Sequence, residues 1–89
     1  MEFEFDPEKS ARNKLKHGID FLQAQELWED ADRVEVPART VGEPRWLVVA
    51  RVDGVHWSAV VTYRGTRVRI ISVRRSRSEE VKIYEEDEH

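Results

Sequence analysis

Apolar and polar residues alternate with period two in several short segments of this chain, which is the pattern of half-buried β-strands. Residues 2–5 read Glu-Phe-Glu-Phe and predict a short edge strand. Asp53-Gly54 and Arg64-Gly65 are typical of tight turns between antiparallel strands. Around these turns, the other predicted strands are residues 34–36, 45–52, 55–63 and 67–73, the last three forming a meander.

A helical period predicts a first helix over residues 7–17. Asp6 is placed as its N-cap, and Gly18 supplies a left-handed stop at its C-terminal end. Ala11 and Leu15 lie one turn apart, so we expect them to share the apolar face of this helix.

A second helix is predicted from residue 21 to about residue 29, with Asp20 as its cap. Its apolar stripe consists of Phe21, Ala24, Leu27 and Trp28. The two helices should form a hairpin that covers one face of the sheet. A short final helix is expected after Ser76 or Ser78, with Glu79 completing a capping box with Ser76.

These elements indicate one α+β domain over residues 1–89: an antiparallel sheet meander, an N-terminal helical hairpin packed against it, and a short C-terminal helix. Residues 39–44 are expected to form a loop, and residues 85–89 a frayed tail. Without cysteine there is no disulfide or thiolate nucleophile. There is neither a signal-peptide pattern nor an apolar run near the roughly 20 residues of a membrane span, so we expect a cytoplasmic protein.

Positive charge is concentrated in one segment of a chain whose formal net charge is -3. Residues 64–77 contain six arginines and no acid. Guanidinium groups bind phosphate through a planar fork, so this segment favours a phosphodiester site or the docking of an acidic partner. Residues 78–89 contain six acids. The alternative is therefore that the two segments neutralise one another.

Several separated segments match one known family. Residues 3–21 (FEFDPEKSARNKLKHGIDF) resemble the opening of BrnT-type toxins of bacterial type II toxin–antitoxin systems. Residues 64–75 (RGTRVRIISVRR) are similar to the family's Arg-Gly and Arg-Ile-Ile-Ser-Ala-Arg core, and residues 79–86 to its Glu-x-x-x-Tyr-Glu tail. Glu43 and Arg45 stand where the family has a Glu and an Arg before its long hairpin.

The resemblance implies a RelE-like fold and a metal-independent ribonuclease, without cofactors, that inhibits translation and growth. It also implies a cognate BrnA-like antitoxin with a ribbon-helix-helix domain. That domain binds operator DNA, so the toxin is held at the DNA only through the antitoxin. Three residues depart from the family pattern: Phe5 replaces Trp, Tyr63 replaces an acid, and Val73 replaces Ala. The loss of an acid at Tyr63 keeps open a degenerate, non-catalytic module that binds antitoxin or RNA without cleaving.

Metal-free RNA cleavage needs a base for the 2′-hydroxyl proton, cations for the phosphorane and an acid for the leaving oxygen. His17 is a natural acid or base because histidine titrates near neutral pH. The predicted catalytic residues are His17, Lys16, Glu43, Arg69 and Arg74. The predicted RNA-binding residues are Arg45, Arg67, Arg75 and Trp46, the last as a base-stacking ring.

Structural alternatives accompany these assignments. Arg69 would instead form a cross-strand ion pair, His17 would serve the last carbonyls of its helix, and Glu43 would pair with Arg45. A regular strand would also place Arg67, Arg69, Ile71 and Val73 on one face. The sequence contains no zinc motif, Gly-rich nucleotide loop or nucleophile elbow.

Overall fold

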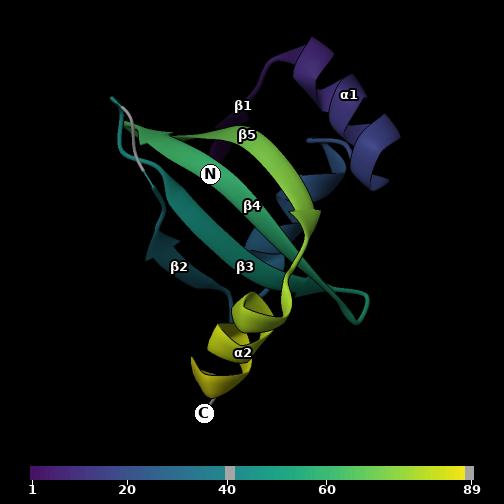
Figure 1. Ribbon diagram of the computed structural model, residues 1–89. Helices are drawn as coiled ribbons and strands as arrows, with labels where there is room; N and C mark the ends of the chain where they lie inside the picture. The colour runs from purple at the N-terminus through teal and green to yellow at the C-terminus, as the bar shows by residue number, and fades with distance from the viewer. Residues whose placement is uncertain (40–41, 88–89) are drawn as a thin grey trace.

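A five-stranded sheet forms the centre of the molecule, in the order β1-β5-β4-β3-β2 (Figure 1). The computed structural model describes residues 1–39 and 42–87. The strands are β1 (Glu2–Glu4), β2 (Val34–Pro37), β3 (Trp46–Val52), β4 (Val55–Arg64) and β5 (Arg67–Arg75). The helical elements are α1 (Pro7–His17), the 3-10 helix η1 (Gln23–Glu29) and α2 (Ser78–Asp87). The α+β class and the β3-β4-β5 meander are confirmed.

The expectation of a purely antiparallel sheet is wrong, because β1 runs parallel to β5. Glu2 lies opposite Arg67, and Glu4 lies opposite Arg69. No hairpin links these two strands, which lie near opposite ends of the sequence. The long connection between them allows the parallel direction.

The predicted helical hairpin is also wrong, since η1 takes the place of a second α-helix. Phe21, Ala24 and Leu27 are all buried and follow one another at intervals of three. A 3-10 helix has three residues per turn, so this spacing brings the second and third of them onto one line. Asp20 still has a capping role, because its Oδ1 accepts a hydrogen bond from the Gln23 N–H at 2.7 Å.

The first helix has the predicted ends but not the predicted face. Asp6 caps it through the Glu8 N–H at 2.9 Å, and Gly18 ends it with φ +80°. Its buried residues are the polar Ser10 and Asn13, whereas Leu15 is 89% exposed. Both polar side chains bond to backbone outside the helix. Ser10 Oγ accepts a hydrogen bond from the Phe21 N–H at 2.9 Å, and the bonds of Asn13 are described below.

A β-bulge in β5 changes which side chains of that strand point to each face of the sheet. Val60 lies opposite Ser72 and Val61 opposite Ile70, so Ile71 is an extra residue without a partner across the ladder. Such a bulge reverses the alternation of side chains beyond it. Val68, Ile70 and Val73 therefore all enter one core cluster, and the predicted common face of Arg67 and Val73 does not form.

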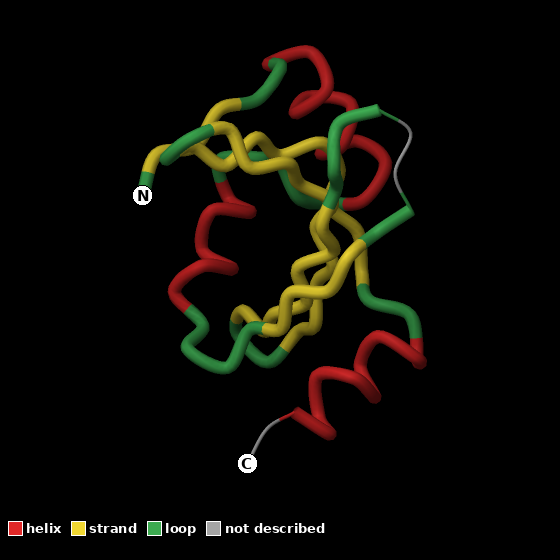
Figure 2. Tube along the Cα trace, turned by 90° about the vertical axis from the view of Figure 1, so that its left-hand side faces the viewer, coloured by secondary structure: helices red, strands yellow, loops and turns green. Residues whose placement is uncertain are grey.

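Two hydrophobic clusters lie on opposite sides of the sheet. The larger cluster joins the sheet to the residues after α1 and to η1, including Ile19, Phe21 and Leu27. The smaller cluster packs Tyr84 of α2 against Val34 and Val49. Figure 2 shows α2, which leads to the C-terminus, at the lower right, apart from the other helical segments at the top and at the left.

Two predicted boundaries shift slightly. The second hairpin turn falls on Gly65 and Thr66, and α2 continues to Asp87 instead of fraying from residue 85. The predicted capping pair is wrong as well. Glu80, not Glu79, reaches back to the backbone, accepting a hydrogen bond from the Arg77 N–H at 2.9 Å.

Parts of two predictions, residues 40–41 of the loop and residues 88–89 of the tail, lie outside the described residues. Within the described part of the chain, no helix is long and apolar enough to cross a membrane.

Candidate active site

Three of the four arginines of β5, Arg67, Arg69 and Arg74, are held by carboxylates. Arg67 pairs with Glu2 at 3.4 Å, and Arg69 pairs with Glu4 at 3.1 Å. Both pairs join β5 to the parallel strand β1, in which the two glutamates flank Phe3. Arg69 thus makes the cross-strand ion pair that was the alternative to a phosphate contact.

The pair between Arg74 and Glu80 is the most buried of these contacts. Two guanidinium nitrogens of Arg74 donate to the two carboxylate oxygens at 2.7 and 2.8 Å. Glu80, only 7% exposed, also accepts from Ser58 Oγ and from the Arg77 N–H. The bonds from Arg74 are the main cause that lowers the pKa of Glu80 to about 2, against the opposing effect of burial. The same contact raises the pKa of Arg74. This network fixes α2 to the sheet.

The remaining predicted residues lie in different places. Glu43 pairs with Arg64 at 3.3 Å and not with Arg45. Trp46 is half-buried at the start of β3, while Arg75 stacks over Trp57 at the far end of β5, 5.5 Å from the ring centroid. Arg67 and Arg74 are seven residues apart on one strand, a separation of roughly 20 Å. The predicted residues therefore do not converge on one phosphate in this structure.

Tyr63, which replaces an acid of the family pattern, has its own carboxylate partner. Its hydroxyl donates a hydrogen bond to Glu35 of β2. Burial, together with this bond, raises the pKa of Tyr63. Its ring lies beside Trp46, with centroids 6.4 Å apart, and both side chains share the sheet face opposite Arg69.

A pocket of about 310 Å³ lies between α1 and the bulge of β5, and we call it the α1–β5 pocket. It is lined by Lys9, Arg12, Asn13, Lys16, His17, Ile71 and Ser72. The lining contains three cations and a histidine, and among described residues no carboxylate contributes to it. Two of the predicted catalytic residues, Lys16 and His17, therefore meet in one hollow.

The cations of this pocket are unpaired, unlike Arg67, Arg69 and Arg74 of β5. Among the described residues, Lys9, Arg12, Lys16 and His17 make no side-chain hydrogen bond or ion pair. Three of them, at positions 9, 12 and 16, follow the i, i+3, i+7 spacing that places residues on one face of a helix. An anion entering here meets cationic groups with no competing carboxylate.

The polar residue Asn13 fixes the geometry of the pocket. Its Nδ2 donates to the carbonyls of Ile19 at 2.8 Å and Val73 at 2.9 Å, and its Oδ1 accepts from the Val73 N–H at 3.2 Å. These bonds attach α1 to the part of β5 that β1 does not cover. The cationic face of α1 is thereby held beside Ile71 and Ser72.

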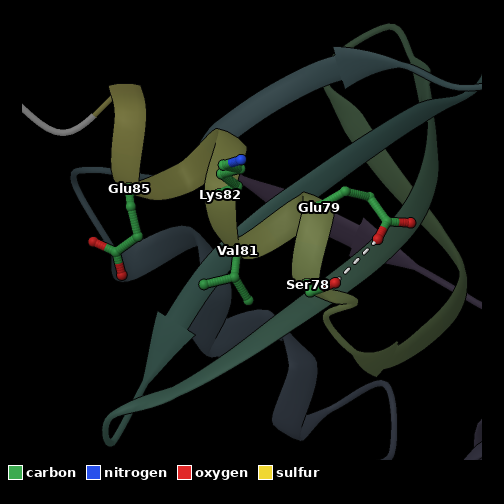
Figure 3. Close-up of a pocket in the computed structure, with 5 residues that line it drawn as sticks. All are labelled: Ser78, Glu79, Val81, Lys82 and Glu85. Carbon is green, nitrogen blue, oxygen red and sulfur yellow. Dashed lines mark hydrogen bonds between the residues drawn. The ribbon is translucent and has the colours of Figure 1, made fainter.

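A larger hollow of about 550 Å³ lies along α2 (Figure 3). The residues drawn in Figure 3, Ser78, Glu79, Val81, Lys82 and Glu85, come from successive turns of this helix. Its two carboxylates outnumber its single cation, and it contains no histidine. The α1–β5 pocket is therefore the better site for chemistry on a phosphodiester.

Comparison with known proteins decides the family. The family model described as "Ribonuclease toxin, BrnT, of type II toxin-antitoxin system" matches residues 5–80. The chain belongs to this family. Comparison with curated proteins finds no match. Membership of the BrnT family indicates a ribonuclease toxin of a type II toxin–antitoxin system, and such a toxin has an antitoxin partner.

The BrnT match spans α1 and β5, the two elements that build the α1–β5 pocket. The sequence prediction included Lys16 and His17 but missed Lys9 and Arg12. Their spacing along the predicted helix was a usable signal, because it aligns both with Lys16 on one face. The arginine run of residues 64–77 is the denser cluster of positive charge in the sequence.

Proposed function

We propose that this BrnT-family chain is a single-domain endoribonuclease that cleaves RNA without a metal ion, at the α1–β5 pocket. The observation that carries the proposal is the meeting of His17 with three unpaired cations in one hollow. The 2′-oxygen of the substrate loses its proton to a base and bonds to the adjacent phosphorus, giving a 2′,3′-cyclic phosphate. The bond from phosphorus to the 5′-oxygen of the next nucleotide breaks, and that oxygen takes up a proton. Cleavage arrests translation and growth in the cytoplasm.

His17 has the role of general acid or base in this scheme, since an imidazole can both accept and donate a proton. Lys16 and Arg12 stabilise the extra charge on the phosphorane, and Lys9 binds the phosphate from the adjacent turn. Backbone of RNA extending from the pocket reaches the predicted RNA-binding residues Arg75 at one end of β5 and Arg67 at the other.

Catalytic roles for Arg69 and Arg74 would require RNA to replace their carboxylates, Glu4 and Glu80. That exchange is easier at Arg69, whose ion pair is partly exposed, than at the buried pair of Arg74. Glu43 would similarly have to leave Arg64 before acting as a base. Arg45 and Trp46 lie at the same end of the sheet as Glu43 and Arg64. RNA bound in the α1–β5 pocket would contact them only if it followed an extended path across the sheet.

The partner in this proposal is a BrnA-like antitoxin with a ribbon-helix-helix domain, which alone contacts operator DNA. Docking of an acidic antitoxin segment over the unpaired cations would block RNA entry. The alternative function is binding of antitoxin or RNA without cleavage. It is supported by the described lining of the α1–β5 pocket, which contains no carboxylate that could act as a general base.

The deciding experiment incubates purified, antitoxin-free protein with total RNA in EDTA. Wild type should cleave, while His17→Gln and Lys16→Gln should each lose at least about tenfold in rate. Lys82→Gln, which removes a cation from α2 on the other side of the sheet, is the matched control and should cleave like wild type. A folded wild type that leaves RNA intact, alone and in translating extracts, would instead support the binding module.

A further inference from the structure

A third hollow, of about 300 Å³, is lined in part by Gly18 and Ile19, the residues that directly follow α1. It is formed by the residues after α1, by η1 and by the β3–β4 hairpin, and we call it the hairpin pocket. Its lining includes Gly18, Glu26, Val52, Asp53, Val55 and Trp57.

The two pockets are neighbours through the chain itself. His17 lines the α1–β5 pocket and Gly18, the next residue, lines the hairpin pocket. Asn13 fixes this junction, since one amide nitrogen bonds both the Ile19 carbonyl and the Val73 carbonyl. On β5, Ser72 faces the first pocket, and Arg75 covers the ring of Trp57 at the second. Three residues of strand span roughly 10 Å, the scale of one nucleotide.

The charges of the two linings are opposite. The α1–β5 pocket is lined by cations and by no described carboxylate. The lining of the hairpin pocket has two carboxylates, Glu26 and Asp53, and the cation beside it, Arg75, lies over the ring of Trp57. Neither carboxylate forms an ion pair or a side-chain hydrogen bond with described residues. A phosphate is therefore favoured in the first pocket and disfavoured in the second.

The hairpin pocket instead has the surfaces that hold a base. Val52, Val55 and the half-buried Trp57 give it apolar walls, and an indole ring is a stacking partner for a base. Carboxylates only accept hydrogen bonds. They favour a base edge with adjacent N–H donors, which guanine has at N1 and N2, and disfavour uracil, whose N–H lies between two carbonyls.

We infer that the hairpin pocket is a guanine-binding subsite, which holds the base of the nucleotide whose phosphate enters the α1–β5 pocket. The inference rests on the proposed ribonuclease function and adds its base preference. Glu26 and Asp53 accept from the guanine edge, and the base stacks on the face of Trp57 that Arg75 does not cover. RNA should consequently be cut preferentially next to guanine.

The test is a titration of isotope-labelled protein with guanosine 3′-monophosphate and with uridine 3′-monophosphate, followed by nuclear magnetic resonance. Both nucleotides should shift the amides of Lys16 and His17, because they carry the same phosphate. The guanosine nucleotide alone should shift the Gly18 amide and the Trp57 indole N–H, and should bind about tenfold more tightly.

Variants separate a base contact from a general structural effect. Glu26→Gln should remove most of the guanine preference, whereas Glu29→Gln, on the same 3-10 helix but outside the pocket lining, should retain it. Trp57→Phe should keep guanosine binding and Trp57→Leu should weaken it. Equal shifts of Gly18 by both nucleotides, or an unchanged preference in Glu26→Gln, would overturn the inference.

Cleavage of an RNA that contains every dinucleotide step distinguishes this idea from the proposed function. Cleavage without base preference, together with a Gly18 amide that does not move, would refute the guanine subsite and leave the ribonuclease standing. Guanosine-selective shifts in a protein that cuts no RNA would refute the ribonuclease and leave the subsite standing.

Discussion

The side-chain amide of Asn13 pairs with both backbone polar groups of Val73, at 2.9 Å from Nδ2 to the carbonyl oxygen and 3.2 Å from the N–H to Oδ1. At the edge of β5, β1 pairs with residues 67–69 only. Farther along the same strand, the Asn13 side chain makes the two backbone hydrogen bonds at Val73 that a neighbouring strand would make. The contact attaches α1 to the sheet edge and holds its cationic face over the bulge. A buried side chain that satisfies three backbone groups is expected to matter for stability as well as for the site.

Replacement of Asn13 by alanine should lower the free energy of unfolding by about 2–4 kcal/mol, because the Val73 and Ile19 groups would lose their partners while buried. Urea denaturation would measure this loss. Arg12→Ala, on the exposed side of the same turn, should change the stability by less than about 0.5 kcal/mol. An Asn13→Ala variant as stable as Arg12→Ala would contradict this role.

The pKa of Glu80, lowered to about 2 by Arg74, makes stability depend on pH. Because the folded pKa lies below the unfolded value, the contribution is complete above about pH 5 and is lost as the pH falls toward about 2. Its size is about 3 kcal/mol. Unfolding free energies of wild type and Glu80→Gln should therefore differ at neutral pH and converge in acid. Glu79→Gln, an exposed neighbour, should follow wild type throughout; a constant gap for Glu80→Gln would argue against the assignment.

Truncation of Arg69 and Arg74, the two arginines predicted as catalytic, should lower the free energy of unfolding by different amounts. Arg74→Ala leaves Glu80 buried without its main partner, at a cost of about 3 kcal/mol, whereas Arg69→Ala removes a partly exposed pair worth at most about 1 kcal/mol. Thermal unfolding distinguishes them. Adding Glu80→Ala to Arg74→Ala should recover part of the loss. If it recovers nothing, the carboxylate is not what destabilises the single variant.

Removal of one cation from the α1–β5 pocket should weaken RNA binding for all sequences alike. For Arg12→Gln, the slope of log affinity against log salt should fall by about 0.7, the value for one phosphate contact with a single strand. A 2′-deoxy oligonucleotide, which cannot be cleaved by its own 2′-hydroxyl, permits the measurement at equilibrium. Lys82→Gln should keep the full slope, and an undiminished slope in Arg12→Gln would place the RNA elsewhere.

Leu15 provides a test of which face of α1 is buried. At 89% exposed, it should tolerate Leu15→Gln with less than about 0.5 kcal/mol of change in unfolding free energy. The same substitution at the buried Leu27 should cost several times more. Urea denaturation of both variants makes the comparison, and equal losses would mean that Leu15 is buried in solution.

Local chemistry in the sequence determined the ends of α1, the β3–β4 turn and the meander. Asp6, Gly18 and Asp53-Gly54 act through their own backbone and near neighbours, so their effects need no tertiary information. The interval of three among Phe21, Ala24 and Leu27 was also present in the sequence. It favoured a 3-10 helix, although a longer α-helix was predicted.

Tertiary structure alone decided which charges are neutralised and which remain available. The partners of Arg67 and Arg69 come from β1, more than sixty residues earlier in the chain, through a parallel pairing that no local pattern specifies. The bulge at Ile71 likewise arises from the register between two strands. Ion pairs neutralise four arginines of the run, Arg64, Arg67, Arg69 and Arg74, while the less conspicuous cations of α1 stay unpaired beside His17. The sequence therefore established the family and the kinds of residue required, while the packing of α1 against β5 decided where those residues meet.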